Sequence, residues 1–123
     1  MLEHVNITVP DPVVTAQRFV DLFGWKIRWQ GGAINGGYSV HVGTDDNYIA
    51  LYAPAGHVTP CGDSYTTAGG LNHIGVVVDD LEAAAVKVRE MGYAPHSFDI
   101  YDPGRRFYFD DADGIEIEVV SYS

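Results

Sequence analysis

The feature that most constrains this chain is an internal duplication. The stretch that begins at position 2 repeats its pattern from position 71, 71 − 2 = 69 positions later. In residues 2–9 and 71–78 the side chains alternate between two sets along the chain, and both stretches are rich in β-branched residues. This predicts two strands, each with two distinct faces. His4 and His73 occupy the same place in the two stretches. One histidine is therefore expected on the same face of two equivalent strands.

The rest of each half follows a common order of elements. In the first half a helix over 13–23 ends at Gly24, and in the second a helix from the Asp79–Asp80 pair to about Met91 ends at Gly92. Strands are predicted at 25–30, 38–42 and 48–53, and then at 94–100, 106–109 and 115–120. Each half is therefore predicted to be βαβββ.

This order predicts an α+β fold. We expect two tandem βαβββ modules that form a curved mixed sheet around a cavity, with one helix per module on the outside. A length of 123 residues suits a single domain over 1–123, with module one at 1–53, a linker at 54–70 and module two at 71–123. A linker of about 17 residues without periodicity is often functional.

Charge and composition exclude several classes of function. Seven basic and 17 acidic residues give a net charge of −10, which disfavours nucleic acid and anionic membranes as partners. No apolar run approaches the roughly 20 residues of a membrane span, and no signal peptide is visible. The single cysteine, Cys61, cannot form an internal disulfide, as is typical of a reducing compartment. We therefore expect a cytoplasmic protein.

One acidic residue of the last strand joins the two histidines as a candidate ligand. Strand alternation places Glu118 on the face opposite Ile117, and an offset of 68 aligns Glu118 with Ala50. With His4 and His73 in matched registers, the three side chains are expected to converge in the cavity. Imidazole and carboxylate suit Zn²⁺, Fe²⁺, Mn²⁺ or Ni²⁺, and three ligands leave positions for water and substrate.

Three segments carry a family resemblance. Residues 4–9 (HVNITV), 73–78 (HIGVVV) and 108–118 (YFDDADGIEIE) resemble the vicinal oxygen chelate superfamily, which includes glyoxalases, bleomycin-resistance proteins and extradiol dioxygenases. The resemblance covers essentially the whole chain. It implies the paired-module fold, a small-molecule substrate or ligand and a homodimer, in some members with a site shared between chains.

The resemblance also implies roles for particular residues. The family's metal ligands fall on His4, His73 and Glu118, and the fourth ligand of the glyoxalases falls on Ala50, which cannot bind a metal. Two histidines and one glutamate instead match the extradiol dioxygenases and the fosfomycin-resistance transferases. Tyr108 resembles a tyrosine that hydrogen-bonds the substrate oxygen near the metal, which implies a catalytic role. The cofactor is expected to be one divalent ion, Fe, Mn, Zn or Ni.

Further side chains are candidates for substrate binding. Three tyrosines, Tyr38, Tyr48 and Tyr52, are predicted to share a strand face and would make the pocket aromatic. Arg106 would hold an anionic group of the substrate or merely balance local acidic residues. The same alignment predicts that His41 faces the helix side, and we expect His96 and His57 to be exposed.

Two functions are consistent with these residues. The first is a divalent-metal enzyme of the lyase, dioxygenase or transferase type, acting on a small oxygenated molecule chelated to the metal. Tyr108 would exchange a proton with the bound oxygen. The alternative is a metal-free protein of the bleomycin-resistance type, which binds a small ligand between aromatic walls.

Overall fold

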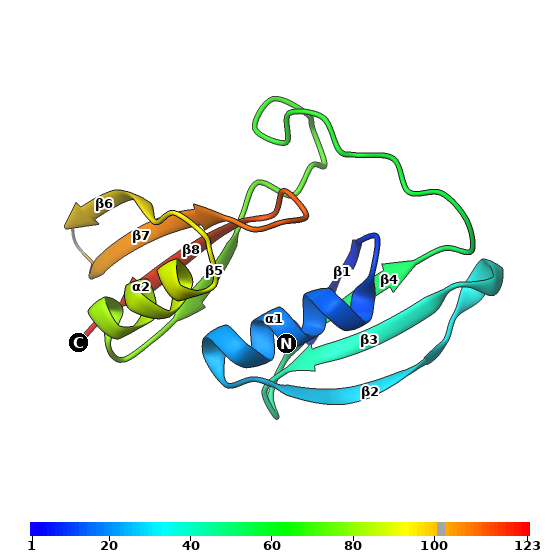
Figure 1. The fold of residues 1–123 in the computed structure, drawn as a ribbon, viewed down its shortest axis with the longest axis horizontal. Coiled ribbons are helices and arrows are strands. Elements are labelled where there is room, and N and C mark those ends of the chain that lie inside the picture. Colours follow the sequence, from blue (N-terminus) through cyan, green and yellow to red (C-terminus); the bar gives the residue numbers. More distant parts are fainter. Residues whose placement is uncertain (101–102) are drawn as a thin grey trace. The chain divides into compact units, whose positions relative to one another are not determined.

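The computed structural model describes residues 1–100 and 103–123, and it divides the chain into two compact units, Met1–Pro60 and Cys61–Ser123 (Figure 1). Each unit contains one helix and one four-stranded mixed sheet. This confirms the predicted α+β fold of two βαβββ modules. No helix in the described part of the chain is long and apolar enough to cross a membrane.

The first unit places its helix on one face of its sheet. Its elements are β1 (His4–Thr8), α1 (Pro12–Phe23), β2 (Lys26–Gly32), the one-turn helix η1 (Ile34–Gly36), β3 (Tyr38–Gly43) and β4 (Tyr48–Ala53). The strand order is β1-β4-β3-β2, with β1 parallel to β4 and the other pairs antiparallel. Figure 1 shows α1 lying along this sheet.

Local signals explain why α1 begins and ends where it does. The Asp11 carboxylate accepts two backbone N–H bonds of the first turn, both at 3.2 Å, and Gly24 adopts a left-handed conformation with φ 68° that ends the helix. Phe19 of the helix and Val42 and Leu51 of the sheet have no exposed surface. The apolar face of α1 therefore forms the core of this unit with one face of the sheet.

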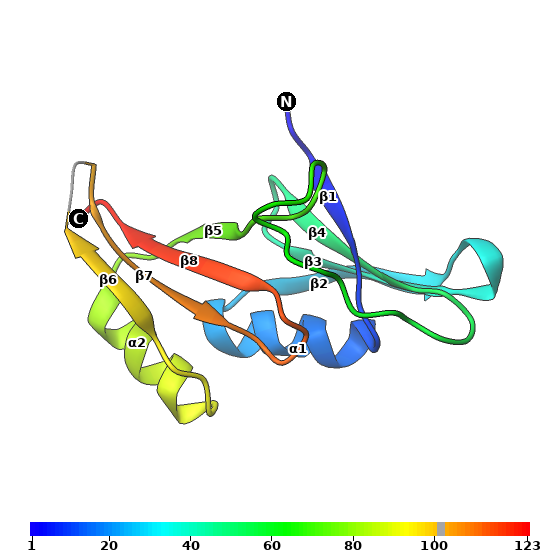
Figure 2. The ribbon, with the colours of Figure 1, turned by 90° about the horizontal axis from the view of Figure 1, so that it is seen from above.

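The second unit repeats this arrangement. Its elements are β5 (Ile74–Val77), α2 (Leu81–Glu90), β6 (His96–Ile100), β7 (Arg105–Asp110) and β8 (Glu116–Ser121). The strand order is β5-β8-β7-β6, and α2 packs against β7 and β8 (Figure 2). The sequence predicted that His73 lies inside a strand over 71–78. The strand β5 begins only at Ile74, so His73 lies immediately before it. In each unit we call the sheet face turned away from the unit's own helix the open face.

The strand register corrects the prediction for His41. A single offset of 68 fails for the third strand of each module, because residues 44–47 join β3 to β4 while the longer segment 111–115 joins β7 to β8. His41 pairs with Ala50 and Tyr108 pairs with Glu118, so the offset for His41 is 108 − 41 = 67. His41 therefore corresponds to Tyr108 and lies on the open face.

The register also corrects the prediction for Tyr38. Tyr38 pairs with Ala53. Val40, which follows Tyr38 by two residues in the same strand, pairs with Leu51, and Leu51 is buried beneath α1. Residues paired across an antiparallel sheet share a face, so Tyr38 points to the helix side. Its hydroxyl donates to Gln30 Oε1 at 3.0 Å. Tyr38 therefore does not share a sheet face with the other two tyrosines of the predicted pocket.

Candidate metal and ligand site

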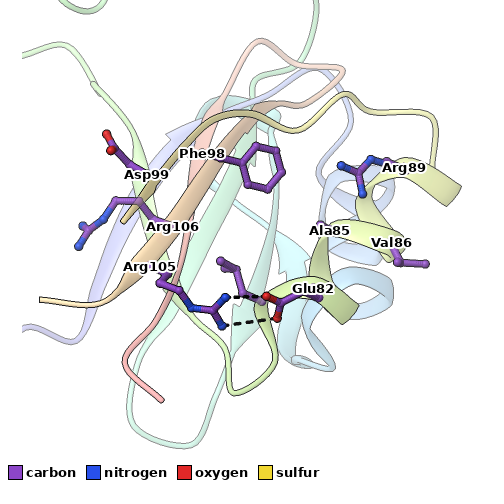
Figure 3. Close-up of a pocket in the computed structure, with 9 residues that line it drawn as sticks. Glu82, Ala85, Val86, Arg89, Phe98, Asp99, Arg105 and Arg106 are labelled. Atoms are coloured by element: carbon purple, nitrogen blue, oxygen red, sulfur yellow. Dashed lines mark hydrogen bonds and ion pairs between the residues drawn. The ribbon is translucent and has the colours of Figure 1, made fainter. Parts of the chain in front are cut away.

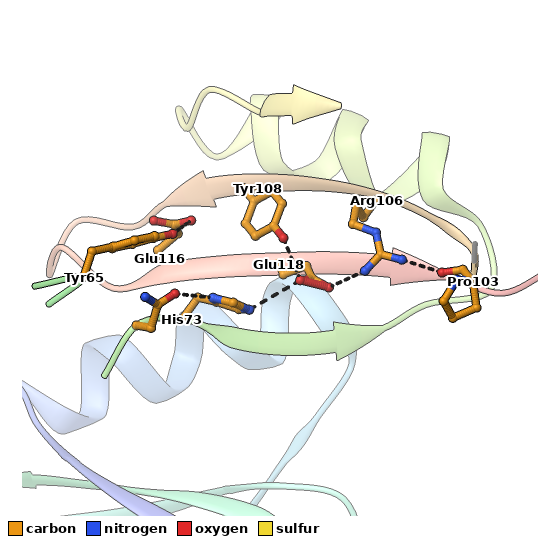
Figure 4. A network of polar contacts seen from close by, with 8 residues as sticks. Tyr65, His73, Pro103, Arg106, Tyr108, Glu116 and Glu118 are labelled. Carbon is orange, nitrogen blue, oxygen red and sulfur yellow. Dashed lines mark hydrogen bonds and ion pairs between the residues drawn. The ribbon is translucent and has the colours of Figure 1, made fainter. Parts of the chain in front are cut away.

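Glu118 is the centre of a polar network on the open face of the second sheet (Figure 4). Tyr108 Oη donates to Glu118 Oε1 at 2.8 Å, and Arg106 Nη1 donates to Oε2 at 3.1 Å. His73 Nε2 lies 3.4 Å from Oε1. Only 13% of the Glu118 side chain and 9% of the Arg106 side chain are exposed. The carboxylate is thus largely buried and has three polar neighbours on the open face.

The sheet register explains how these groups meet. Tyr108 pairs directly with Glu118 across β7 and β8, and Gly75 of β5 pairs with Glu118 from the other side. His73 stands two residues before Gly75, on the same side of the chain. The His73 and Tyr108 rings meet edge to face, with centroids 5.6 Å apart. The register places Tyr108 beside Glu118 on one face, and the contact between His73 and Glu118 brings the histidine to the same carboxylate.

The orientation of His73 suits a metal ligand. Its Nδ1 lies 2.7 Å from Asn72 Oδ1, which can accept a proton carried on Nδ1, and Nε2 is directed at Glu118 Oε1. An imidazole whose other nitrogen is held in this way is typical of histidine ligands. Two electron-pair donors that face each other are stabilised by a cation or a proton between them. The donor chemistry of His73 and Glu118 therefore fits a divalent metal ion.

Arg106 gives the same carboxylate a partner within the protein. Its guanidinium donates to Glu118 Oε2 and also to the backbone carbonyl of Pro103. This ion pair compensates the buried charge of Glu118 without any metal. The carboxylate therefore already has a cationic partner in Arg106, and a divalent ion at His73 and Glu118 would bind beside that positive charge.

Two further groups lie on this open face. Tyr65, from the segment before β5, donates to Glu116 Oε1 at 2.6 Å, and this bond to a carboxylate raises the pKa of Tyr65 to about 12. His96 Nε2 lies 3.2 Å from Asp110 Oδ2. Sequence reasoning missed Tyr65, because the only signal in that segment was its length, and strand periodicity does not reach into a loop.

The open face of the first sheet carries a row of four stacked or tilted rings, one from each strand. The centroids of His4 and Tyr48 are 4.9 Å apart, those of Tyr48 and His41 4.6 Å, and those of His41 and Trp29 5.0 Å. We call this set the ring row. Arg28 Cζ lies 4.5 Å from the centroid of the Tyr48 ring. The pKa of His41 is lowered, first by burial and then by the charges of His4 and Arg28.

A pocket of about 410 Å³ opens beside one end of the ring row. Its walls combine aromatic rings with a few polar groups: Asn6, Trp29, Ala33, Ile34, Ser39, His41 and Tyr52. Tyr52 Oη donates to the Ile34 carbonyl at 3.0 Å, so the Tyr52 ring is fixed in the wall. A pocket of this size with aromatic walls suits a small planar molecule.

The candidate residues thus fall into two groups. The second unit brings together His73, Glu118, Tyr108 and Arg106, and the first unit holds His4, Tyr48 and Tyr52 on its open face. His4 Nδ1 lies 2.8 Å from Glu3 Oε1. Within residues 1–100 and 103–123, no three His, Cys, Asp or Glu side chains form a group close enough to hold a metal ion. The ligand set with His4 stays a prediction.

Comparison with known proteins points to one family. The model of the glyoxalase/bleomycin resistance protein/dioxygenase superfamily matches residues 3–109. No curated protein sequence matches the chain. A crystal structure of a glyoxylase/bleomycin resistance protein/dioxygenase domain from Frankia sp. EAN1pec is 23% identical, with a TM-score of 0.82, and the match covers 98% of this chain and 96% of that one.

Two other solved structures share the fold at lower identity. The fosfomycin resistance protein FosX from Listeria monocytogenes, crystallised with Mn(II) and sulfate, is 15% identical with a TM-score of 0.73 over 100% of this chain and 93% of that chain. TnmS3, an antibiotic-binding protein from Streptomyces sp. CB03234, is 18% identical with a TM-score of 0.71 over 100% and 96%. These likenesses show the fold.

Proposed function

Because this chain belongs to the glyoxalase/bleomycin resistance protein/dioxygenase superfamily, we propose that it is a divalent-metal enzyme acting on a small oxygenated molecule. The observation that carries the proposal is the arrangement of His73 and Glu118, whose Nε2 and Oε1 atoms face each other at 3.4 Å. The related FosX structure contains Mn(II), which supports this class of metal. The proposal takes His4 as the third ligand on sequence grounds alone.

The side chains around Glu118 have distinct tasks in this proposal. Asn72 holds the His73 ring so that Nε2 is directed at Glu118. When bound, a divalent ion supplies Lewis-acid stabilisation of negative charge that develops on a substrate oxygen. The Tyr108 hydroxyl, which donates to Glu118 Oε1 at 2.8 Å, is placed to give a proton to that oxygen or take one from it.

Arg106 bears on the substrate class through its fixed donors. Its guanidinium is held at the site by Glu118 and the Pro103 carbonyl, and Glu118 balances its charge. A guanidinium held in place favours a substrate with an anionic or strongly polarised oxygen that can accept a hydrogen bond. Small diols, α-ketoaldehydes and their anionic relatives are the compounds to screen first.

Metal content tests the proposal directly. Protein purified without chelator and dialysed against Mn²⁺, Fe²⁺, Zn²⁺ or Ni²⁺ is expected to hold about one ion per chain for at least one of these metals, by elemental analysis. His73→Gln should lose it, because the variant removes a nitrogen ligand. His96→Gln is the matched control, since His96 lies on the same open face but pairs with Asp110. Equal metal content in wild type and His73→Gln would contradict the proposal.

A second candidate function rests on a different observation. The Arg106–Glu118 ion pair satisfies the buried carboxylate without metal, and the ring row with its adjacent pocket suits a planar ligand. This favours metal-free binding of an aromatic compound, and TnmS3, which shares the fold, is an antibiotic-binding protein. Absence of metal in the wild type, together with fluorescence quenching of Trp29 by planar ligands, would favour this candidate over the enzyme.

A further inference from the structure

The helix side of the second unit contains a pocket that the proposed function does not use. It has a volume of about 400 Å³ and lies between α2 and strands β6 and β7 (Figure 3). α1 packs on all of β2, β3 and β4, but α2 packs chiefly on β7 and β8. The edge strand β6 is therefore covered less well by α2 than the edge strand β2 is by α1. The pocket lies between α2 and this less covered strand.

The floor of this pocket is apolar, although it is open to solvent. Leu81 and Ala85 form its buried part on α2. Val86 on α2 and Phe98 on β6 are 50% and 56% exposed. The Phe98 ring packs against Phe107 of the core with centroids 5.4 Å apart, so one side of Phe98 is fixed while the other faces the pocket. Neighbouring exposed apolar side chains at a concave site are typical of a binding surface.

The rim supplies positive charge. Arg105 and Glu82 form an ion pair, with Nη1 2.6 Å from Oε1, so the charge of Arg105 is largely compensated. Arg89 has no ion-pair partner among the residues that the structure describes. An acidic residue three or four positions before Arg89 on the helix could form an ion pair with it, but these positions are occupied by Val86 and Ala85. Arg89 is thus a cation beside an apolar floor, in a chain with net charge −10.

Figure 3 shows how these groups face the pocket. Arg89 and Phe98 are turned toward each other from α2 and β6, while the Asp99 carboxylate is directed away from Arg89. An arginine fork binds a carboxylate through two parallel hydrogen bonds, and a phenyl ring beside it accepts a flat apolar group. One wall thus recognises an anion and the other an apolar body.

The geometry points to a second ligand site, which binds a small amphipathic carboxylate. Its carboxylate pairs with Arg89, and its aromatic or branched apolar part lies on Phe98, Val86 and Leu81. The volume of the pocket suits a molecule of one or two rings. Arg106 also borders this pocket, but the groups proposed to contact the ligand are Arg89, Phe98, Val86 and Leu81, none of which belongs to the network around His73 and Tyr108. The inference therefore does not depend on the metal proposal.

The test uses 3-phenylpropanoate as the probe, titrated into the whole protein and followed by amide NMR. We expect saturable shifts confined to α2 and to β6 and β7, at millimolar or lower probe concentration. The alcohol 3-phenylpropan-1-ol, which has the same apolar part without the charge, should bind at least about fivefold more weakly, because it cannot form the ion pair with Arg89.

Two variants of one helix separate the proposed contact from a general charge effect. Arg89→Gln should raise the dissociation constant of the probe by about fivefold or more. Lys87→Gln removes the same charge from an exposed position that does not line the pocket, and it should leave the constant unchanged within error. Both positions are exposed, so both variants are expected to fold.

Three results would overturn the inference. The first is no shift in α2, β6 or β7 at millimolar probe, and the second is equal affinity for acid and alcohol. The third combines two observations: the wild type self-associates but does not bind the probe, and Phe98→Ser no longer self-associates. That last result would show that this face is instead an interface between copies of the chain.

Discussion

Replacing Glu118 by glutamine tests the electrostatic account of the candidate site. The substitution keeps the shape of the side chain but removes the charge that compensates Arg106. The glutamine oxygen can accept from Arg106, and its amide group can donate to the Tyr108 hydroxyl oxygen. Glu118→Gln therefore keeps hydrogen bonding possible at this position and chiefly removes the charge opposite Arg106.

The expected cost follows from burial. With 13% and 9% of the two side chains exposed, solvent screens the Glu118–Arg106 pair only weakly. Removing one partner of a fully buried ion pair costs about 3–5 kcal/mol, and we expect no more than about 3 kcal/mol here because the pair is part-buried and Arg106 keeps its bond to the Pro103 carbonyl. In Arg106→Gln/Glu118→Gln both charges are gone. The double variant should be more stable than the sum of the single effects predicts, by about 2 kcal/mol.

Urea denaturation followed by circular dichroism measures these differences. The wild type, the two single variants and the double variant form a double-mutant cycle, read from the midpoints at constant slope. Glu116→Gln is the matched control on the same strand face, since Glu116 is bonded to Tyr65, which is exposed. Its effect should be much smaller. Additive single effects, with a coupling energy near zero, would refute the claim that Arg106 and Glu118 form an energetically coupled buried pair.

Two further predictions concern titration. Glu116→Gln should lower the pKa of Tyr65 from about 12 toward 10.0, as read from tyrosinate absorbance against Tyr65→Phe. Because the folded-state pKa is raised, the stability that this bond contributes is present below pH 10 and is lost as the pH rises toward 12; an unchanged titration in the variant would contradict the bond. The pKa of His41, lowered mainly by burial, should rise toward 6.5 in Trp29→Ala, measured by NMR of the imidazole. Its depressed pKa means that stability increases with pH up to about 6.5, and a wild-type value above 6.5 would count against this reasoning.

Several features of the site could be predicted from the sequence because they depend on alternation within one strand. The face of the last strand that carries Glu118 follows from the period of two in a strand. The order of helices and strands followed from helical spacing, from the Asp11 cap and from Gly24. These signals are local, and neighbouring strands do not alter them.

The predictions that were wrong depended on how strands align with one another. His41 was assigned to the helix side by one offset for the whole repeat, and the longer turn between β7 and β8 breaks that offset by one residue. A shift of one residue moves a side chain to the other face, which also explains the misplacement of Tyr38.

The sequence by itself determined the repeated fold and the residue types available on each open face. Only the tertiary structure decided which of them interact: Arg106 reaches Glu118 diagonally across two strands, and Tyr65 reaches Glu116 from a loop. The physical reason is that a strand's alternation is fixed by its own backbone. Register and long-range polar contacts depend on turn lengths and on packing between elements distant in the chain.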